Sequence, residues 1–275
     1  MPNFIVGARL HDYGKGTPDE LFGQVSADGF AAVQLAYKKC VPTVKSYADV
    51  THALVAETVA AEKAHHIQVA VLGTYVELAI NDESRLCNVA DFKSQLAVCK
   101  ALGAGCIGTE TTAMSKQPAG TTRAQAQELL CRSLAEILPA AEALGVTVGI
   151  EPVTYHSMNS VAATRHILDT MHSPNLKVIF DMSKLVSAEN VDAQDRIWYD
   201  MGALLGDQIV AVHFKGQAFA PDGSLLHTSL EESRTDYAGA FAMLRQLPQP
   251  ALPVLREEAV PARAASDIAF MKGFF

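Results

Sequence analysis

The chain has 275 residues, of which 49% are hydrophobic and 19% are charged, and its formal net charge is −8. This apolar content is sufficient for a large core and excludes a disordered chain. The negative charge argues against binding to nucleic-acid phosphates, and no apolar run approaches the ~20 residues that cross a bilayer.

The first thirty residues lack the basic start and long apolar run of a secretory signal, so we expect a cytoplasmic protein. The five cysteines are irregularly spaced and form no CxxC pair, which favours reduced thiols. They are Cys40, Cys87, Cys99, Cys106 and Cys131.

Short β-branched runs alternate with longer amphipathic stretches along the whole chain. The expected strands are Phe4–Ala8, Ala32–Leu35, Gln68–Leu72, Cys106–Thr109, Thr147–Glu151, Lys177–Asp181, Ile209–His213 and Pro253–Glu257. The expected helices are Ser46–Ala64, Asp91–Leu102, Thr122–Leu144, Ser160–Met171, Arg196–Leu205, Tyr237–Gln246 and Ala262–Met271. This alternation is typical of parallel βαβ units.

Eight such units predict an α/β fold, a single (β/α)₈ TIM barrel over residues 1–275. The alternative, a doubly wound open sheet, usually has fewer strands and a glycine-rich phosphate turn, whereas GARLHDYGKG after the first strand contains no GxGxxG. Long loops are expected at Thr111–Thr121 and Gly216–Thr235, at the barrel end where catalytic residues usually lie.

Four consecutive predicted strands end in a side chain that can bind a metal. These side chains are Glu151, Asp181, His213 and either Glu257 or Glu258. Such strand ends meet at one barrel mouth, and several carboxylates buried together are costly unless a cation neutralises them. The donor set suits Mn²⁺, Mg²⁺, Co²⁺ or Zn²⁺. Alternation does not decide between the last two glutamates, because a barrel strand is buried on both sides.

Other polar residues near the same mouth are candidates for substrate binding. They are Lys184, Lys215, His156, His11 and Glu110, with Arg9 and Tyr75 as weaker candidates. The alternative for the two lysines and His156 is a loop position without function, and the alternative for Tyr75 is an apolar lid. If both lysines line the mouth, their charge predicts an anionic substrate. We expect no chemistry from the histidines on helices or at the opposite barrel end: His52, His65, His66, His166 and His172.

The order Glu–Asp–His–Glu at strands five to eight resembles the sugar phosphate isomerase/epimerase family of xylose isomerase-like barrels. GFAAVQLA, AVLGTYVEL, GTET, IEPVTYH and PVLREE extend the resemblance over nearly the whole chain. The resemblance implies that Glu151, Asp181, His213 and Glu257 bind one divalent ion. Two positions depart from the family pattern: Lys184 stands where a His is frequent, and Gly216 where an Asp is frequent.

The resemblance implies an isomerase or epimerase of a small sugar, sugar phosphate or related hydroxy-carbonyl compound. Protons would move through a metal-bound cis-enediolate, with Glu151 and Glu257 as the bases. A polyol-ketone dehydratase and a sugar-binding barrel without catalysis are the alternatives.

An endonuclease IV-like hydrolase would need further metal ligands where Gln34 and Gly73 stand. We therefore expect a carbohydrate-like small molecule as partner, with no nucleic acid and no membrane. Proteins of this family often form dimers or tetramers, so the resemblance leaves a homo-oligomer as an open alternative to a monomer.

Overall fold

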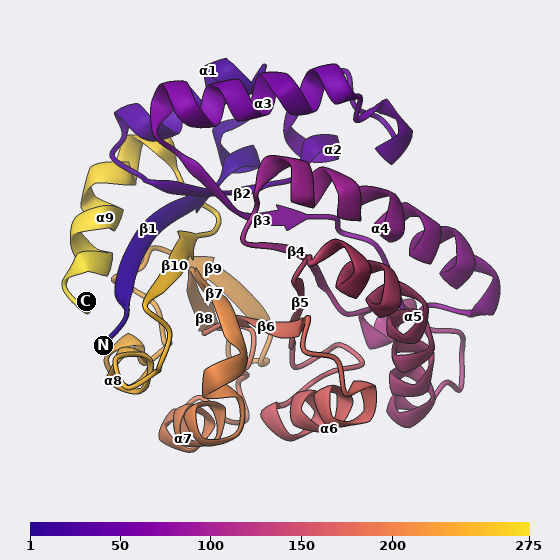
Figure 1. Cartoon of the computed structure of the whole chain (residues 1–275). Helices are drawn as coiled ribbons and strands as arrows, with labels where there is room; N and C mark the ends of the chain where they lie inside the picture. Colours follow the sequence, from indigo (N-terminus) through magenta and orange to yellow (C-terminus); the bar gives the residue numbers. More distant parts are fainter.

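In the computed structural model, which describes residues 1–275, eight parallel strands close into a barrel (Figure 1). The strands follow one another around the barrel as β1, β10, β7, β6, β5, β4, β3 and β2. Their bounds are β1 Asn3–Arg9, β2 Ala32–Leu35, β3 Gln68–Gly73, β4 Cys106–Glu110, β5 Val148–Glu151, β6 Leu176–Asp181, β7 Ile209–Phe214 and β10 Ala251–Arg256. The predicted TIM barrel is confirmed, and each predicted strand coincides with an observed one to within two residues at either end.

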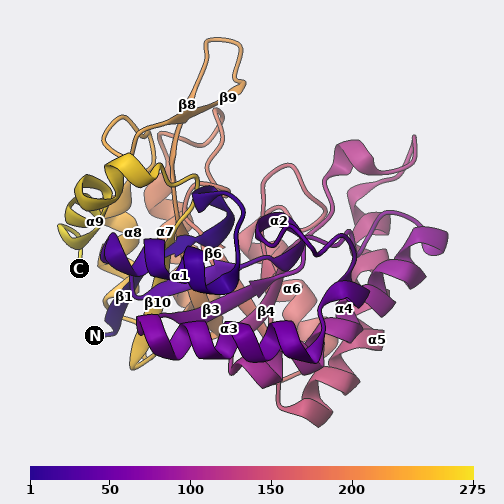
Figure 2. The ribbon, with the colours of Figure 1, turned by 90° about the horizontal axis from the view of Figure 1, so that it is seen from above.

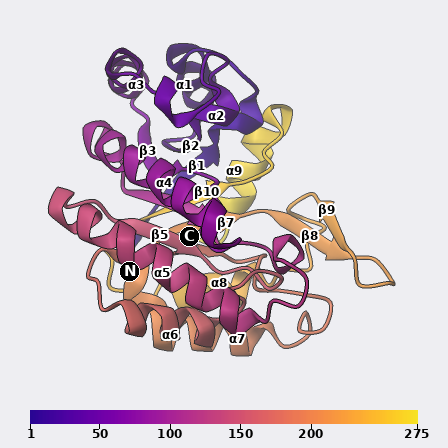
Figure 3. The same ribbon diagram turned by 90° about the vertical axis from the view of Figure 1, so that its right-hand side faces the viewer.

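Helices surround the barrel and cover its outer face (Figures 1 and 3). They are α1 Pro18–Ala27, α2 Tyr37–Cys40, α3 His52–His65, α4 Asp82–Leu102, α5 Arg123–Leu144, α6 Val161–Met171, α7 Gln194–Leu205, α8 Tyr237–Leu244 and α9 Ala264–Lys272. None of them combines the length and hydropathy that a membrane crossing requires.

Helix starts account for most differences from the expected elements. Helix α1 was not among the predicted helices, although Thr17 and Glu20 form a capping box around its first turn. Helix α4 begins nine residues before the expected Asp91, because the side chain of Asn81 accepts the backbone N–H of Ser84. Helix α3 begins at His52 rather than Ser46, since Thr51 caps it and residues 47–49 form a separate 3₁₀ turn.

The segment expected as a loop after β7 contains an antiparallel hairpin. Its strands are β8 (Gly216–Phe219) and β9 (Leu225–Thr228). The hairpin projects from the barrel beyond the ends of the other strands (Figure 2). It therefore adds a wall to one side of the mouth.

A small cluster of buried apolar side chains fills the barrel interior below the mouth, and Ile179 of this cluster faces two glycines. A Cβ on Gly149 would lie 2.8 Å from Cγ1 of Ile179, and one on Gly108 would lie 2.5 Å from Cδ1 of the same residue. Because β4 and β5 carry no side chain there, Ile179 of β6 reaches across the interior. This packing closes the floor of the pocket described next.

Candidate active site

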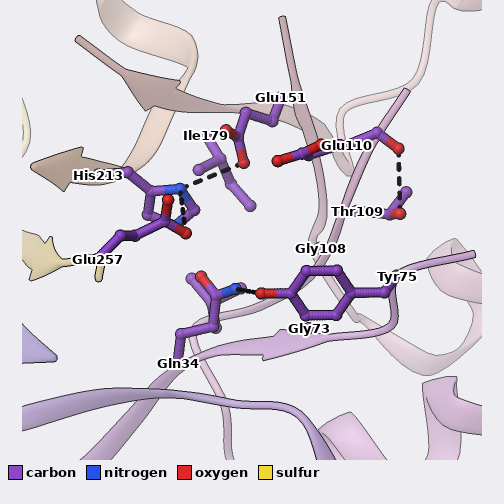
Figure 4. A pocket seen from close by; sticks show the side chains of 11 residues that line it. Gln34, Gly73, Tyr75, Gly108, Thr109, Glu110, Glu151, Ile179, His213 and Glu257 are labelled. Atoms are coloured by element: carbon purple, nitrogen blue, oxygen red, sulfur yellow. Dashed lines mark hydrogen bonds and ion pairs between the residues drawn. The ribbon is translucent and has the colours of Figure 1, made fainter. Parts of the chain in front are cut away.

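Strand register brings the predicted site residues to the same depth at the carboxyl end of the barrel. Asp181 is paired with His213 between β6 and β7, and Glu110 with Glu151 between β4 and β5. Glu110, Glu151, His213 and Glu257 line one pocket above Ile179 (Figure 4). The mouth of the barrel is therefore the place where most of the predicted residues meet.

Three of the four predicted metal ligands form a tight buried group. Glu151, Asp181 and His213 each offer a ligand atom, and these atoms lie within 4.8 Å of one another. Oε1 of Glu151, Oδ2 of Asp181 and Nε2 of His213 are buried without a hydrogen-bond partner. Buried polar atoms normally have partners, so this oxygen and nitrogen donor set fits a divalent cation.

The end of β6 positions Asp181 for such a role. Its Oδ1 accepts the backbone N–H groups of Ser183 (2.7 Å) and Lys184 (3.1 Å), which holds the carboxylate in a turn. Its other oxygen, Oδ2, is buried without a hydrogen bond and lies 3.5 Å from Nζ of Lys215. One carboxylate thus serves both local structure and the candidate metal group.

The structure separates Glu257 from Glu258, which the sequence alone left open. Arg256 turns outward, where its Nε donates to Asp267 Oδ2 at 2.8 Å, and Glu257 points into the pocket. Glu257 Oε1 lies 3.4 Å from His213 Nδ1. Glu258 has a left-handed φ of 57° and contacts His227 of the hairpin at 2.6 Å instead. Only Glu257 of the two lies with the other candidate ligands.

The pKa values of the two pocket glutamates are shifted in opposite directions. Burial raises the pKa of Glu151 to about 7, against the opposing effect of His213. Burial also disfavours ionised Glu257, but His213 and neighbouring cations outweigh it and lower that pKa to about 2. His213 is disfavoured as a cation by burial, yet Glu257 and Glu151 raise its pKa to about 9.

Both lysines lie at the mouth, and each has a carboxylate partner. Lys184 Nζ donates to Glu110 Oε1 at 2.7 Å. Lys215 is 3% exposed, with Nζ 3.5 Å from Asp181 Oδ2. Neither lysine is therefore unpaired, so this pair does not support the expected anionic substrate. The anionic substrate stays a prediction.

The remaining candidates surround the pocket at its rim. His156 is buried, with Nε2 3.8 Å from Glu110 Oε2, and burial lowers its pKa to about 4. His11 lies edge-on to Tyr75, and burial together with Arg9 lowers its pKa to about 3. Both imidazoles are therefore neutral near pH 7.

From the sequence we proposed no role for two residues near Tyr75 at this pocket. Gln34 lines the pocket and donates through Nε2 to the hydroxyl of Tyr75 at 2.9 Å (Figure 4). Lys39 lies over the ring of Tyr75, 3.4 Å from its centroid. The polar end of β2 was the available signal for Gln34, whereas nothing in the sequence pattern indicated Lys39.

Comparisons with known proteins agree with this architecture. A family model described as xylose isomerase-like TIM barrel matches residues 22–273. A search of curated sequences finds no significant match.

Several solved structures are similar in fold. 3-Keto-D-glucoside 4-epimerase from E. coli has 17% identity and a TM-score of 0.72, over 98% of this chain and 100% of that chain. D-psicose 3-epimerase, solved in the presence of D-fructose, has 16% identity and a TM-score of 0.72, over 98% and 97%. A xylose isomerase-like TIM barrel protein from Mycobacterium smegmatis in complex with magnesium has 13% identity and a TM-score of 0.72, over 98% and 96%. At these identities the likeness shows the fold.

Proposed function

The chain belongs to the xylose isomerase-like TIM barrel family, and from this premise we propose that it is a divalent-metal-dependent epimerase or isomerase of a neutral sugar. The observation that carries the proposal is the buried group Glu151, Asp181 and His213, with Glu257 beside it. The epimerases among the structural neighbours support the same class of reaction.

The four residues would hold the ion through carboxylate oxygens and one imidazole nitrogen. A bound divalent ion would supply Lewis acidity, which polarises a carbonyl and acidifies the adjacent C–H bond. Asp181 is fixed by its turn and is best suited to a purely ligating role. His213 would serve as a neutral ligand.

Glu151 and Glu257 are the candidate bases. They come from the ends of β5 and β10, and both contact Nδ1 of His213, at 3.2 and 3.4 Å. In an epimerisation, one of these carboxylates would accept the proton from one face of the substrate carbon, and the other, in its protonated form, would return a proton to the opposite face. In an aldose–ketose isomerisation, Glu151 alone would move the proton between neighbouring carbons.

Charge pairing favours a neutral sugar over a sugar phosphate. Lys184 is held by Glu110, and Lys215 faces Asp181 and Glu257. A phosphate group would have to compete with these carboxylates for either ammonium group. Hydroxyl groups can instead bond to Glu110 and His156 without displacing a charge.

The test is deuterium exchange from solvent. The metal-loaded protein is incubated in D₂O with free ketohexoses, their phosphates and 3-keto-glucosides, and NMR detects deuterium beside the carbonyl. We expect exchange into a neutral sugar, reduced by about 10²–10⁴-fold in Glu151→Gln. Glu258→Gln is the matched control and should exchange normally. Absence of exchange into every compound, or full activity in Glu151→Gln, would refute the proposal.

A further inference from the structure

The charged side chains around the pocket form two ion pairs that each have no net charge and one group with an excess of negative charge, which we call the unbalanced group. Arg9 donates to Asp12 through Nε and NH2, at 2.9 and 2.7 Å, and its NH1 also lies 3.8 Å from Glu257 Oε2. The Arg9–Asp12 pair therefore adjoins Glu257 but adds no net charge to it. Lys184 donates to Glu110 at 2.7 Å. Lys39, over the Tyr75 ring, lies on the exposed rim, where water screens its charge.

The unbalanced group contains three carboxylates and one ammonium group. Its carboxylates are Glu151, Asp181 and Glu257, and its cation is Lys215. With His213 neutral, as metal ligation requires, three negative charges and one positive charge leave a net charge of −2. One divalent ion neutralises this group.

The chain fixes Lys215 firmly in this position. Its backbone carbonyl accepts the Ser183 hydroxyl at 2.9 Å and the Tyr237 hydroxyl at 2.8 Å. Its buried Nζ lies 3.5 Å from Asp181 Oδ2 and 3.9 Å from Glu257 Oε2. The Asp181 atom that it faces is the oxygen left without a hydrogen bond in the candidate metal group.

We propose that Lys215 is a built-in counter-ion that sets the charge of the candidate metal site, weakens the binding of every cation there, and discriminates against ions of charge higher than +2. This inference rests on the metal site of the proposed function. Repulsion between an ammonium group and an ion grows with the charge of the ion, so a trivalent ion is penalised more than a divalent one. In the loaded site no net charge is left to attract or repel a substrate.

The experiment measures ion binding rather than turnover. Metal-free protein is titrated with Mn²⁺ and with Tb³⁺ at constant pH by calorimetry. The variants are Lys215→Met and Lys215→Gln, which both remove the charge, and Lys215→Arg, which keeps it. The matched control is the double variant Lys184→Met/Glu110→Gln, which removes a half-buried lysine and its own partner without changing the net charge.

In both neutral Lys215 variants, we expect the Kd for Mn²⁺ to fall by about tenfold or more and the Kd for Tb³⁺ to fall by a larger factor. Lys215→Arg and the double variant should stay within about threefold of the wild type. An unchanged or weaker Mn²⁺ affinity in the neutral variants, or equal effects on both ions, would overturn the role of Lys215. If neither the wild type nor the neutral variants bind an ion, the metal site itself is refuted. If the wild type binds neither ion but the neutral variants do, the counter-ion role of Lys215 is supported.

Discussion

Three consecutive residues at the end of β10 point in three directions, and this determines which of them reaches the pocket. Arg256 turns to Asp267 of α9, Glu257 enters the pocket, and Glu258 adopts a left-handed backbone and contacts the hairpin. The side-chain period of two explains the first two directions. The third depends on the turn after the strand, where Asp12 also accepts the backbone N–H of Ala259.

Metal content separates these two glutamates by experiment. Asp181→Ala and His213→Ala should lose the bound ion, because each removes a ligand atom from the group. Glu257→Gln should weaken binding and reduce deuterium exchange by several orders of magnitude, whereas Glu258→Gln should do neither. Elemental analysis after reconstitution with Mn²⁺, together with the exchange assay, gives the answer. Loss of activity in Glu258→Gln but not in Glu257→Gln would show that the assignment is reversed.

Ion binding should depend on pH, because the ligands must lose their protons. Near neutral pH the metal-free site holds a proton on His213, with a pKa of about 9, and Glu151 titrates at about 7. The ion therefore competes with about one proton between pH 7 and 9 and with more below pH 7. The Kd for Mn²⁺ should tighten as pH rises from 6 to 9. Calorimetry across this range measures the slope, and an affinity independent of pH would contradict protonation of these ligands.

Residue identity at the strand ends was predictable, but the partners of the charged side chains were not. Glu151, Asp181 and His213 follow buried apolar runs, so their position at the mouth follows from the barrel. Lys184 and Lys215 meet carboxylates from other strands, and sequence spacing carries no information on such meetings. Their pairing emerges only when side-chain directions around the closed barrel are known.

At the scale of elements, strands were easier to predict than helix starts. Strands buried on both faces give short apolar runs with clear limits. The start of α4 depends on a single Asn81 side chain, and the amphipathic pattern alone does not mark it. The β8–β9 hairpin has exposed Leu225 and Leu226, so it lacks the apolar run that identified the barrel strands.

The packing of β5 against β6 gives a prediction for the floor of the pocket. Gly149→Ala should destabilise the protein by about 1–3 kcal/mol, because the new Cβ would meet Ile179. Ile179→Ala should cost about 2–5 kcal/mol through the cavity it leaves. The double variant should be more stable than the sum of both losses, since each change relieves the other. Chemical denaturation of all four proteins measures this coupling, and strict additivity would contradict the steric argument.

At the scale of the whole molecule, the chain closes its barrel where its first and last strands meet. Strands β1 and β10 pair over six residues, Asn3–Ala8 with Ala251–Arg256. An aromatic cluster covers this seam: Phe4, Phe214, Tyr237, Phe241, Phe270, Phe274 and Phe275. The two ends of the chain lie on the same side of the molecule (Figures 1 and 2). Closure thus pairs the first strand with β10, the strand that leads directly into Glu257 of the site.

Phe241 is the test of this seam, because its ring is fully buried and contacts Phe4, Phe214 and both C-terminal phenylalanines. Phe241→Ala should lower the free energy of unfolding by about 3–5 kcal/mol, which corresponds to a fall of roughly 6 °C or more in Tm. Tyr199→Ala on the exposed face of α7 is the matched control and should leave Tm nearly unchanged. Calorimetry measures Tm for both variants and the wild type. Titration of both variants with Mn²⁺, at a temperature well below their unfolding transitions, should give the wild-type Kd. If Phe241→Ala does not lower Tm, the aromatic cluster does not stabilise the closure of the barrel. If Phe241→Ala is folded at the titration temperature but its Kd for Mn²⁺ differs from that of the wild type, the seam also shapes the mouth of the barrel.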